Sequence, residues 1–175
     1  LFGTVFIFSI ISIIVFPFYR SFIKPGYFKQ SNKIHTFTLE RASGIKWHPY
    51  SITYENCIKF VQKNTESEDK IYVGVKDHDK VFVNNVLFYF LAERQSGTRY
   101  HELHPGKTDT KIVQQEIIND LKENNVKYIV LQDFPDPGEP NKSSRNSRVN
   151  ILDNFIYKNF IHIDSFGSYE VWEKI

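Results

Sequence analysis

The sequence predicts an α/β fold: a small, Rossmann-like domain with a mostly parallel sheet in three layers, a C-terminal antiparallel strand pair, and one preceding transmembrane helix. Three observations support this prediction. From residue 51 onward, short β-rich segments alternate with segments of helical length, which is typical of parallel strands joined by right-handed crossovers. The last two β-rich segments flank Gly167, which favours a hairpin. Residues 1–19 carry no charged side chain.

The predicted transmembrane helix covers residues 1–19, LFGTVFIFSIISIIVFPFY. As a helix this run would be about 28 Å long, close to the thickness of the hydrocarbon core of a bilayer. Its apolar side chains fill every face, which favours a membrane span over the alternative of a buried core helix. We therefore expect the lipid bilayer to be a partner of this chain.

Residues 20–50 are the predicted basic juxtamembrane connector. It holds four basic residues before the first acid of the chain: Arg20, Lys24, Lys29 and Lys33. The whole chain has a formal charge of +2, so the part that follows carries −2 and lacks the basic surface that nucleic-acid binding requires. We expect no nucleic-acid partner. The basic strip itself either contacts anionic head groups or marks a cytoplasmic flank.

The predicted soluble α/β domain covers residues 51–175. After a possible strand over 36–40, the predicted elements are a helix from Ser51 or Thr53 to Asn64, a strand over 71–75, a helix over 83–94, a strand over 98–103, a helix over 111–125, a strand over 127–132, a helix over 150–160, and the strand pair IHIDSF and SYEVWEKI. Asp109 or Thr110 caps the helix over 111–125. The apolar stripe of that helix consists of Ile112, Val113, Ile117, Ile118 and Leu121.

Ligands of such a sheet bind beyond the carboxyl ends of its strands. The polar side chains expected there are the candidate binding residues: Asp77, His78, Arg99, His101, Glu102 and His104. Such side chains can hold a divalent metal or act as an acid and base pair. The sequence HELH lacks the HExxH spacing of a zinc site, however. We therefore assign no metal ligand and no catalytic residue, and a metal-dependent site at this edge stays an enzymatic alternative.

The remaining motifs argue against several functions. No GxGxxG follows the strand over 71–75, and neither a P-loop nor GxSxG is present, so we expect no dinucleotide and no other cofactor. The lone Cys57 falls within a predicted helix and is expected in the core. The aromatic run from Phe88 to Phe90 is expected to pack in the core, with a sugar-stacking platform as the alternative.

The order of segments resembles a known family. IYVGVKDHDKVFVNNVLFYFLAER, then TRYHELHPG, VQQEII and YIVL are similar to the soluble C-terminal segment of certain polytopic bacterial membrane proteins. Those proteins are identified as glycosyltransferases of the dolichyl-phosphate-mannose protein mannosyltransferase-like superfamily. The resemblance covers the whole chain as a last transmembrane helix with its tail domain. Because the chain starts at Leu1 and contains no methionine, we expect it to be part of a longer protein.

This resemblance implies a function and a location. In that superfamily the donor is a sugar on a polyprenyl phosphate, and the catalytic carboxylates lie in an early extracytoplasmic loop. The parent would be a hexosyltransferase, and this segment would support it or recognise substrate without carrying the catalytic carboxylates. The resemblance also implies a cell-membrane protein with an extracytoplasmic domain; a cytoplasmic domain is the alternative suggested by the basic strip. A membrane-tethered sensor or assembly domain is the non-enzymatic alternative.

Overall fold

The computed structural model describes residues 34–47, 51–79, 85–101, 109–133 and 147–175. The predicted membrane span over residues 1–19 lies outside these ranges. Across the described ranges, no helix combines the length and the apolar character that a membrane crossing requires.

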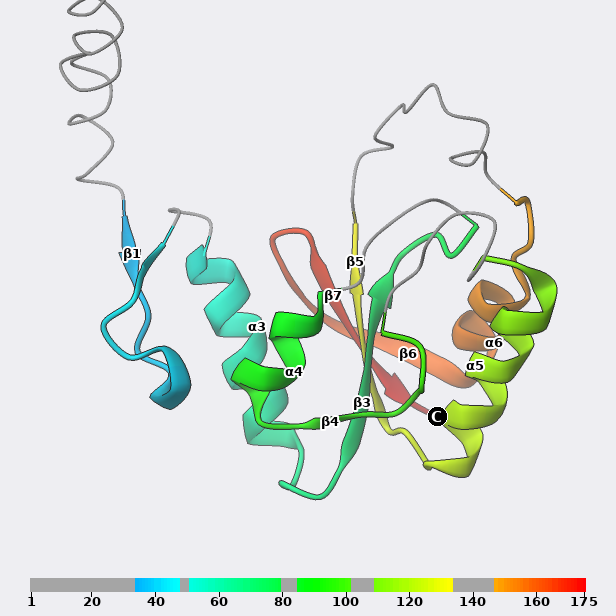
Figure 1. The fold of residues 1–175 in the computed structure, drawn as a ribbon, viewed down its shortest axis with the longest axis horizontal. Coiled ribbons are helices and arrows are strands. Elements are labelled where there is room, and N and C mark those ends of the chain that lie inside the picture. Colours follow the sequence, from blue (N-terminus) through cyan, green and yellow to red (C-terminus); the bar gives the residue numbers. More distant parts are fainter. Residues whose placement is uncertain (1–33, 48–50, 80–84, 102–108, 134–146) are drawn as a thin grey trace, which may run out of the picture.

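A mixed sheet of five strands forms the centre of the domain (Figure 1), in the order β4, β3, β5, β7, β6. The strands are β3 (Lys70–Val75), β4 (Gln95–Ser96), β5 (Tyr128–Gln132), β6 (Phe160–Phe166) and β7 (Tyr169–Lys174). The first three in that order run parallel, whereas β7 is antiparallel to both β5 and β6. The predicted C-terminal antiparallel pair is confirmed, and the sheet as a whole is mixed, with parallel pairing among β4, β3 and β5.

The mixed character comes from the C-terminal hairpin, which turns at Gly167 in a left-handed conformation with φ of 63°. The returning strand β7 buries Tyr169 and Val171 and exposes only Lys174, whereas β6 buries only Phe160. The more buried strand, β7, takes the inner place beside β5, where Val171 pairs with Val130. Strand β6 is left at the edge of the sheet.

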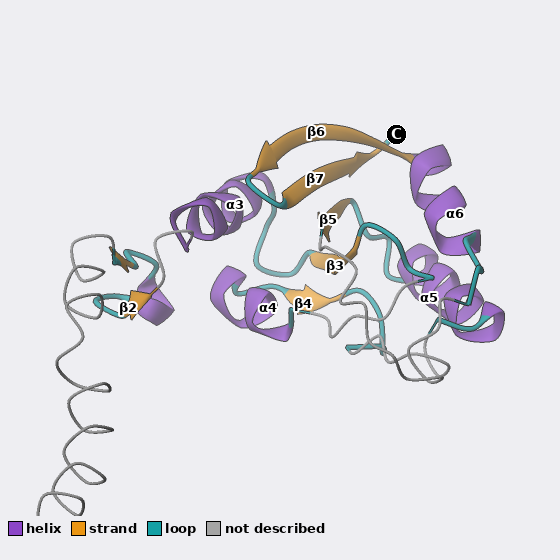
Figure 2. Cartoon of the chain, turned by 90° about the horizontal axis from the view of Figure 1, so that it is seen from above, coloured by secondary structure: helices purple, strands orange, loops and turns teal. Residues whose placement is uncertain are grey.

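Helices cover both faces of the sheet (Figure 2). The first face carries α3 (Ser51–Asn64) and α4 (Val86–Ala92), and the second carries α5 (Lys111–Glu123) and α6 (Ile151–Asn159). Strand side chains alternate between the two cores, as a pleated sheet requires: Ile71 and Val73 pack with α3 and α4, whereas Tyr72 and Ile129 pack with α5 and α6. Cys57 is fully buried in the first core, as predicted.

An N-terminal hairpin lies beside α3 and α4. It consists of β1 (His35–Thr36), the 3₁₀ helix η2 (Glu40–Ala42) and β2 (Lys46–Trp47). The prediction of a strand over 36–40 is wrong beyond Thr36, although Phe37 and Leu39 point into the core as their alternation indicated. The chain turns into η2 because Leu39 accepts a hydrogen bond from the amide of Ala42.

The predicted strand over 98–103 is also wrong for residues 98–101, whereas 102 and 103 lie outside the described ranges. Strand β4 ends at Ser96, and the chain then leaves the sheet toward α5, where Asp120 accepts hydrogen bonds from the Thr98 hydroxyl and the Arg99 amide. Gly97 makes this departure possible, because a Cβ at this position would lie 2.3 Å from Cγ2 of Val126. Hydrogen bonds to α5 therefore take the place of the strand pairing that the sequence predicted for this segment.

The structure confirms the predicted N-terminal cap of α5 but only part of its predicted apolar stripe. Thr110 caps the helix, as predicted, because its side chain accepts a hydrogen bond from the amide of Val113. The predicted stripe is wrong at Ile112, which is 73% exposed. The buried position on that turn belongs to Gln114 instead, whose side chain has several partners described below.

Candidate functional site

A cavity of about 410 Å³ lies between the N-terminal hairpin, the starts of α3 and α4, and the carboxyl end of β5. We call it the aromatic pocket. Its apolar lining includes Phe37, Ile45, Trp47, Tyr54, Leu87, Phe90 and Tyr169. Residues of the hairpin, α3, α4, β5 and the start of β7 therefore meet at an end of the sheet where ligands of α/β proteins bind.

Ring-to-ring contacts fix the inner wall of the pocket. The Tyr54 ring of α3 lies with its centroid 5.3 Å from that of Tyr169 and 5.7 Å from that of Phe88. The edge of the Phe37 ring from the hairpin approaches Tyr54 at 6.5 Å. Such tilted and edge-to-face arrangements are favourable for aromatic pairs, so the wall is held without a ligand.

Polar groups converge on the same wall. The Tyr54 hydroxyl donates a hydrogen bond of 3.1 Å to Oδ1 of Asn85, and Nδ2 of Asn85 donates a longer one of 3.5 Å to the Tyr169 hydroxyl. Gln132, the buried last residue of β5, also hydrogen-bonds Tyr169. Burial raises the pKa of Tyr169 to about 12 and raises that of Tyr54 as well. Both phenols therefore keep their protons at neutral pH and serve as neutral hydrogen-bonding groups.

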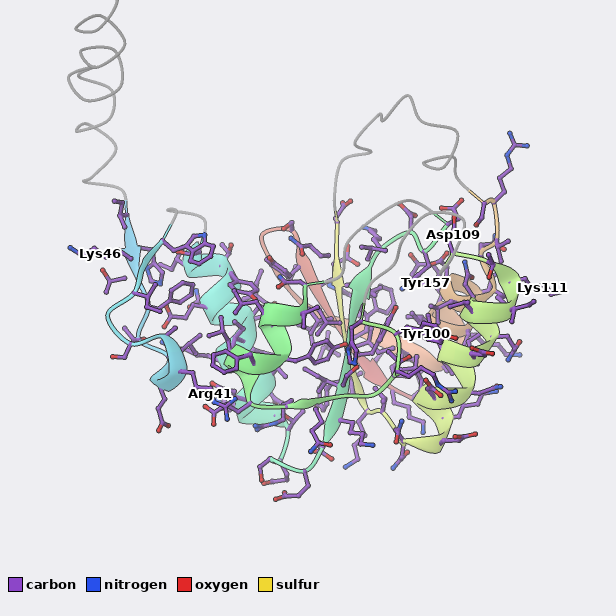
Figure 3. The ribbon with its side chains drawn as sticks, in the orientation of Figure 1. Arg41, Lys46, Tyr100, Asp109, Lys111 and Tyr157 are labelled. Carbon is purple, nitrogen blue, oxygen red and sulfur yellow. The ribbon has the colours of Figure 1, made fainter. Side chains whose placement is uncertain are left out.

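Arg41 closes one end of the pocket. Its guanidinium lies 5.0 Å from the centroid of the Phe90 ring and donates a hydrogen bond to the Phe90 carbonyl. A looser ion pair of 3.6 Å joins it to Glu93. Figure 3 shows Arg41 and Lys46 at opposite ends of the hairpin, with Lys46 at the end nearer the carboxyl ends of β3 and β5.

Glu55 holds the hairpin wall against α3. Its buried carboxylate accepts hydrogen bonds from the amide and the hydroxyl of Thr38, at 2.9 and 2.5 Å, forms an ion pair with Lys59, and is hydrogen-bonded to the ring of His35. Burial alone would raise the pKa of Glu55, but the hydrogen bonds from Lys59, Thr38 and His35 outweigh it and lower the pKa to about 2. The carboxylate stays ionised and fixes one side of the pocket.

Of the predicted binding residues, Asp77 and His78 follow β3. Asp77 is half-buried at the carboxyl edge. His78 is only 1% exposed. Its Nδ1 lies 2.6 Å from Oδ1 of Asp153, and its Nε2 lies 2.8 Å from the Tyr72 hydroxyl. Both nitrogens of the His78 ring are thus engaged in the interior, where they tie the end of β3 to α6.

The other predicted residues lie along the segment after β4. The Arg99 guanidinium is exposed and makes two hydrogen bonds to the carboxylate of Asp120 on α5, which lower the pKa of Asp120. His101 is exposed, and the centroid of its ring lies 6.3 Å from that of Tyr89 in an edge-to-face arrangement. Glu102 and His104 lie outside the described residues. The structure therefore places Arg99 against α5 and His78 against α6.

Gln114 supports the carboxyl edge from inside, a role that no sequence pattern predicted. Its side-chain nitrogen donates hydrogen bonds to the carbonyls of His78, Asp109 and Val149, and its side-chain oxygen accepts one from the amide of Leu152. The position of this glutamine within an apolar stripe was the sequence feature that could have indicated a buried polar residue. Its side chain joins the loop after β3 to the starts of α5 and α6.

The described part of the chain contains no group of three or more His, Cys, Asp or Glu side chains able to hold a metal ion. A second, more open cavity lies beside the turn between β6 and β7, with Asp133 and Glu170 in its lining. Lys76 forms an ion pair with Glu170 at 2.6 Å and lies 4.0 Å from Asp133. A lysine therefore already balances these carboxylates.

Comparison with known proteins gives a likeness in structure but no match in sequence. No protein-family model and no curated protein matches this chain. Among solved structures, the chain is similar to the C-terminal globular domain of an oligosaccharyltransferase from Archaeoglobus fulgidus. The identity is 12% and the TM-score is 0.40, and the match covers 71% of this chain and 97% of the archaeal chain.

Proposed function

We propose that this chain is the tail domain of a membrane glycosyltransferase, and that its aromatic pocket recognises the sugar of a polyprenyl-phosphate donor. The catalytic carboxylates would lie elsewhere in the parent hexosyltransferase, on the extracytoplasmic side of the cell membrane. The resemblance of residues 71–131 to such tails supports the family. The observation that carries the assignment is the pocket, where aromatic walls surround a network of phenol and amide groups.

The chemistry of the pocket suits a hexose. The C–H faces of a sugar ring pack on aromatic side chains, and Trp47 and Phe90 are both more than half exposed in the lining. Sugar hydroxyls both donate and accept, as do the Tyr54 and Tyr169 hydroxyls and the amide of Asn85. A pocket that is mostly apolar with a few converging polar groups is the usual form of a small-molecule site.

The predicted binding residues take two proposed roles. Asp77, His101, Glu102 and His104 are proposed to touch a bound donor or acceptor at the carboxyl edge. His78 and Arg99 are proposed to act by positioning, since their side chains are held by Asp153 and Asp120.

A fluorescence titration tests the pocket. The chain has two tryptophans, so Trp172→Phe leaves Trp47 in the pocket lining as the reporter. The full chain in phosphatidylcholine nanodiscs would be titrated with a short-chain polyprenyl-phosphate hexose, and with the same polyprenyl phosphate without a sugar. We expect a saturable change in Trp47 emission that is stronger for the sugar-bearing lipid.

Two tyrosine variants make the test specific. Tyr54→Phe removes one hydroxyl from the pocket and should weaken binding about three- to ten-fold, the value of one hydrogen bond. Tyr128→Phe removes a hydroxyl that bonds Glu173 on the sheet and should leave binding unchanged. Equal effects of the two variants, or equal binding of the two lipids, would exclude the pocket as a sugar site and favour a tethered assembly domain.

A further inference from the structure

Exposed apolar side chains gather at one end of the domain, around the mouth of the aromatic pocket. Five of the eleven large hydrophobic residues that are exposed in the described ranges lie there, and we call them the apolar rim: Ile34, Trp47, Ile52, Val86 and Leu87. Each is between 42% and 54% exposed. The hairpin, α3 and α4 each contribute to this rim, so no single element explains it.

The five residues share an end of the fold. Ile52 and Val86 lie in the first turns of α3 and α4, which start at the carboxyl-edge end of the sheet (Figure 1). Ile34 adjoins His35, which pairs with Trp47 across the hairpin. Trp47 and Leu87 both line the pocket. The rim therefore surrounds an opening of the pocket at the carboxyl edge.

Two features of the chain indicate what covers this rim. Only residues 20–33 separate Ile34 from the end of the predicted membrane span at Tyr19. Those residues include four basic side chains and no acid. On the folded side, exposed Lys46 lies next to Trp47 at the same end of the hairpin (Figure 3).

We infer that the apolar rim rests in the interface of an anionic bilayer, with Trp47 at the boundary between head groups and acyl chains and with Lys46 against lipid phosphates. Tryptophan favours this depth, and basic residues beside an apolar face attract anionic lipids. The charge of residues 20–33 and Lys46 matches such a surface. The pocket mouth would then open toward the membrane. This inference does not depend on the proposed sugar ligand.

Lipid quenching tests the inference without any sugar present. The full chain with Trp172→Phe would be placed in vesicles of equal parts phosphatidylcholine and phosphatidylglycerol that carry bromine near the top of the acyl chains. We expect Trp47 to lose roughly half of its emission, since interfacial side chains reach this depth. In the matched Trp47→Phe chain, Trp172 of β7 should lose little of its fluorescence emission.

Paired substitutions assign the effect to the rim. Leu87→Ser should reduce the quenching of Trp47, whereas Ile112→Ser, on an exposed residue of α5, should leave it unchanged. Equal quenching of Trp47 and Trp172 would overturn the inference. So would an unquenched, blue-shifted Trp47 signal that depends on protein concentration, because a second copy would then cover the rim. Fluorotryptophan in the unsubstituted chain gives the same comparison by fluorine NMR with spin-labelled lipids if Trp172→Phe fails to fold.

Discussion

Thr38 of the N-terminal hairpin donates its backbone amide to the buried carboxylate of Glu55 on α3, at 2.9 Å. The hydroxyl of the same threonine and the side chains of Lys59 and His35 bind this carboxylate too. One acidic group in α3 thus fixes the hairpin that supplies Trp47 and Ile45 to the aromatic pocket.

This contact predicts a pH dependence of stability. The pKa of Glu55 is about 2 in the folded chain against an ordinary 4.5, so its contribution is complete above about pH 4.5 and is lost as the pH falls toward 2. Urea unfolding in neutral detergent should show that the unsubstituted chain loses about 2 kcal/mol more than Glu55→Gln between pH 7 and pH 3. Glu123→Gln, an exposed change on α5, should behave like the unsubstituted chain. Parallel pH curves for Glu55→Gln and the unsubstituted chain would contradict this assignment.

Gln114 should be the most sensitive polar residue of α5. Gln114→Leu leaves the carbonyls of His78, Asp109 and Val149 without this donor, so we expect the free energy of unfolding to fall by about 3 kcal/mol. Gln115→Leu, one residue along on the exposed face, should change it by less than about 0.5 kcal/mol. Chemical denaturation of both variants checks the contrast, and similar losses would show that the buried amide is not what joins the loops.

Asp120 should control the order of the segment after β4. Asp120→Asn weakens its contacts with the Thr98 hydroxyl and the Arg99 guanidinium and amide, and we expect amide exchange at Arg99 to become about ten-fold faster. Asn119→Ala, on the exposed side of the same turn, is the control. Hydrogen exchange read by NMR measures this, and unchanged protection at Arg99 would mean that Gly97 and the sheet alone hold the segment.

Local patterns predicted much of the fold. Hydrophobic periodicity and capping residues predicted five elements close to their observed bounds: α3, α5, α6, β3 and β5. The sequence of each of these segments is sufficient to indicate its secondary structure. Thr110 is the clearest case: its capping hydrogen bond involves a residue only three positions away. The Gly167 turn was predicted for the same reason, since a left-handed residue is a local requirement.

Long-range contacts decided the features that the sequence did not predict. Strand β4 ends early because Thr98 and Arg99 find Asp120, more than twenty residues later in the chain. The hairpin wall of the pocket depends on the hydrogen bond between Thr38 and Glu55. The contact that closes the pocket depends on the Arg41 guanidinium, which lies over the Phe90 ring. No local pattern reports such pairings. Of the six polar residues predicted at the carboxyl edge, two are held by contacts that no local pattern predicted: His78 is buried against Tyr72, and Arg99 forms an ion pair with Asp120.

The location of the donor sugar is the most direct test of the proposed function. A polyprenyl-phosphate hexose with a photoreactive diazirine on the sugar would be irradiated with the full chain, and the labelled peptides would be mapped by mass spectrometry. We predict labels on Trp47, Tyr54 and the start of α4, and their loss when the unlabelled lipid-linked sugar is added in excess. Labels confined to α5 and α6, or labels that the excess does not remove, would contradict the assignment of the aromatic pocket as the sugar site.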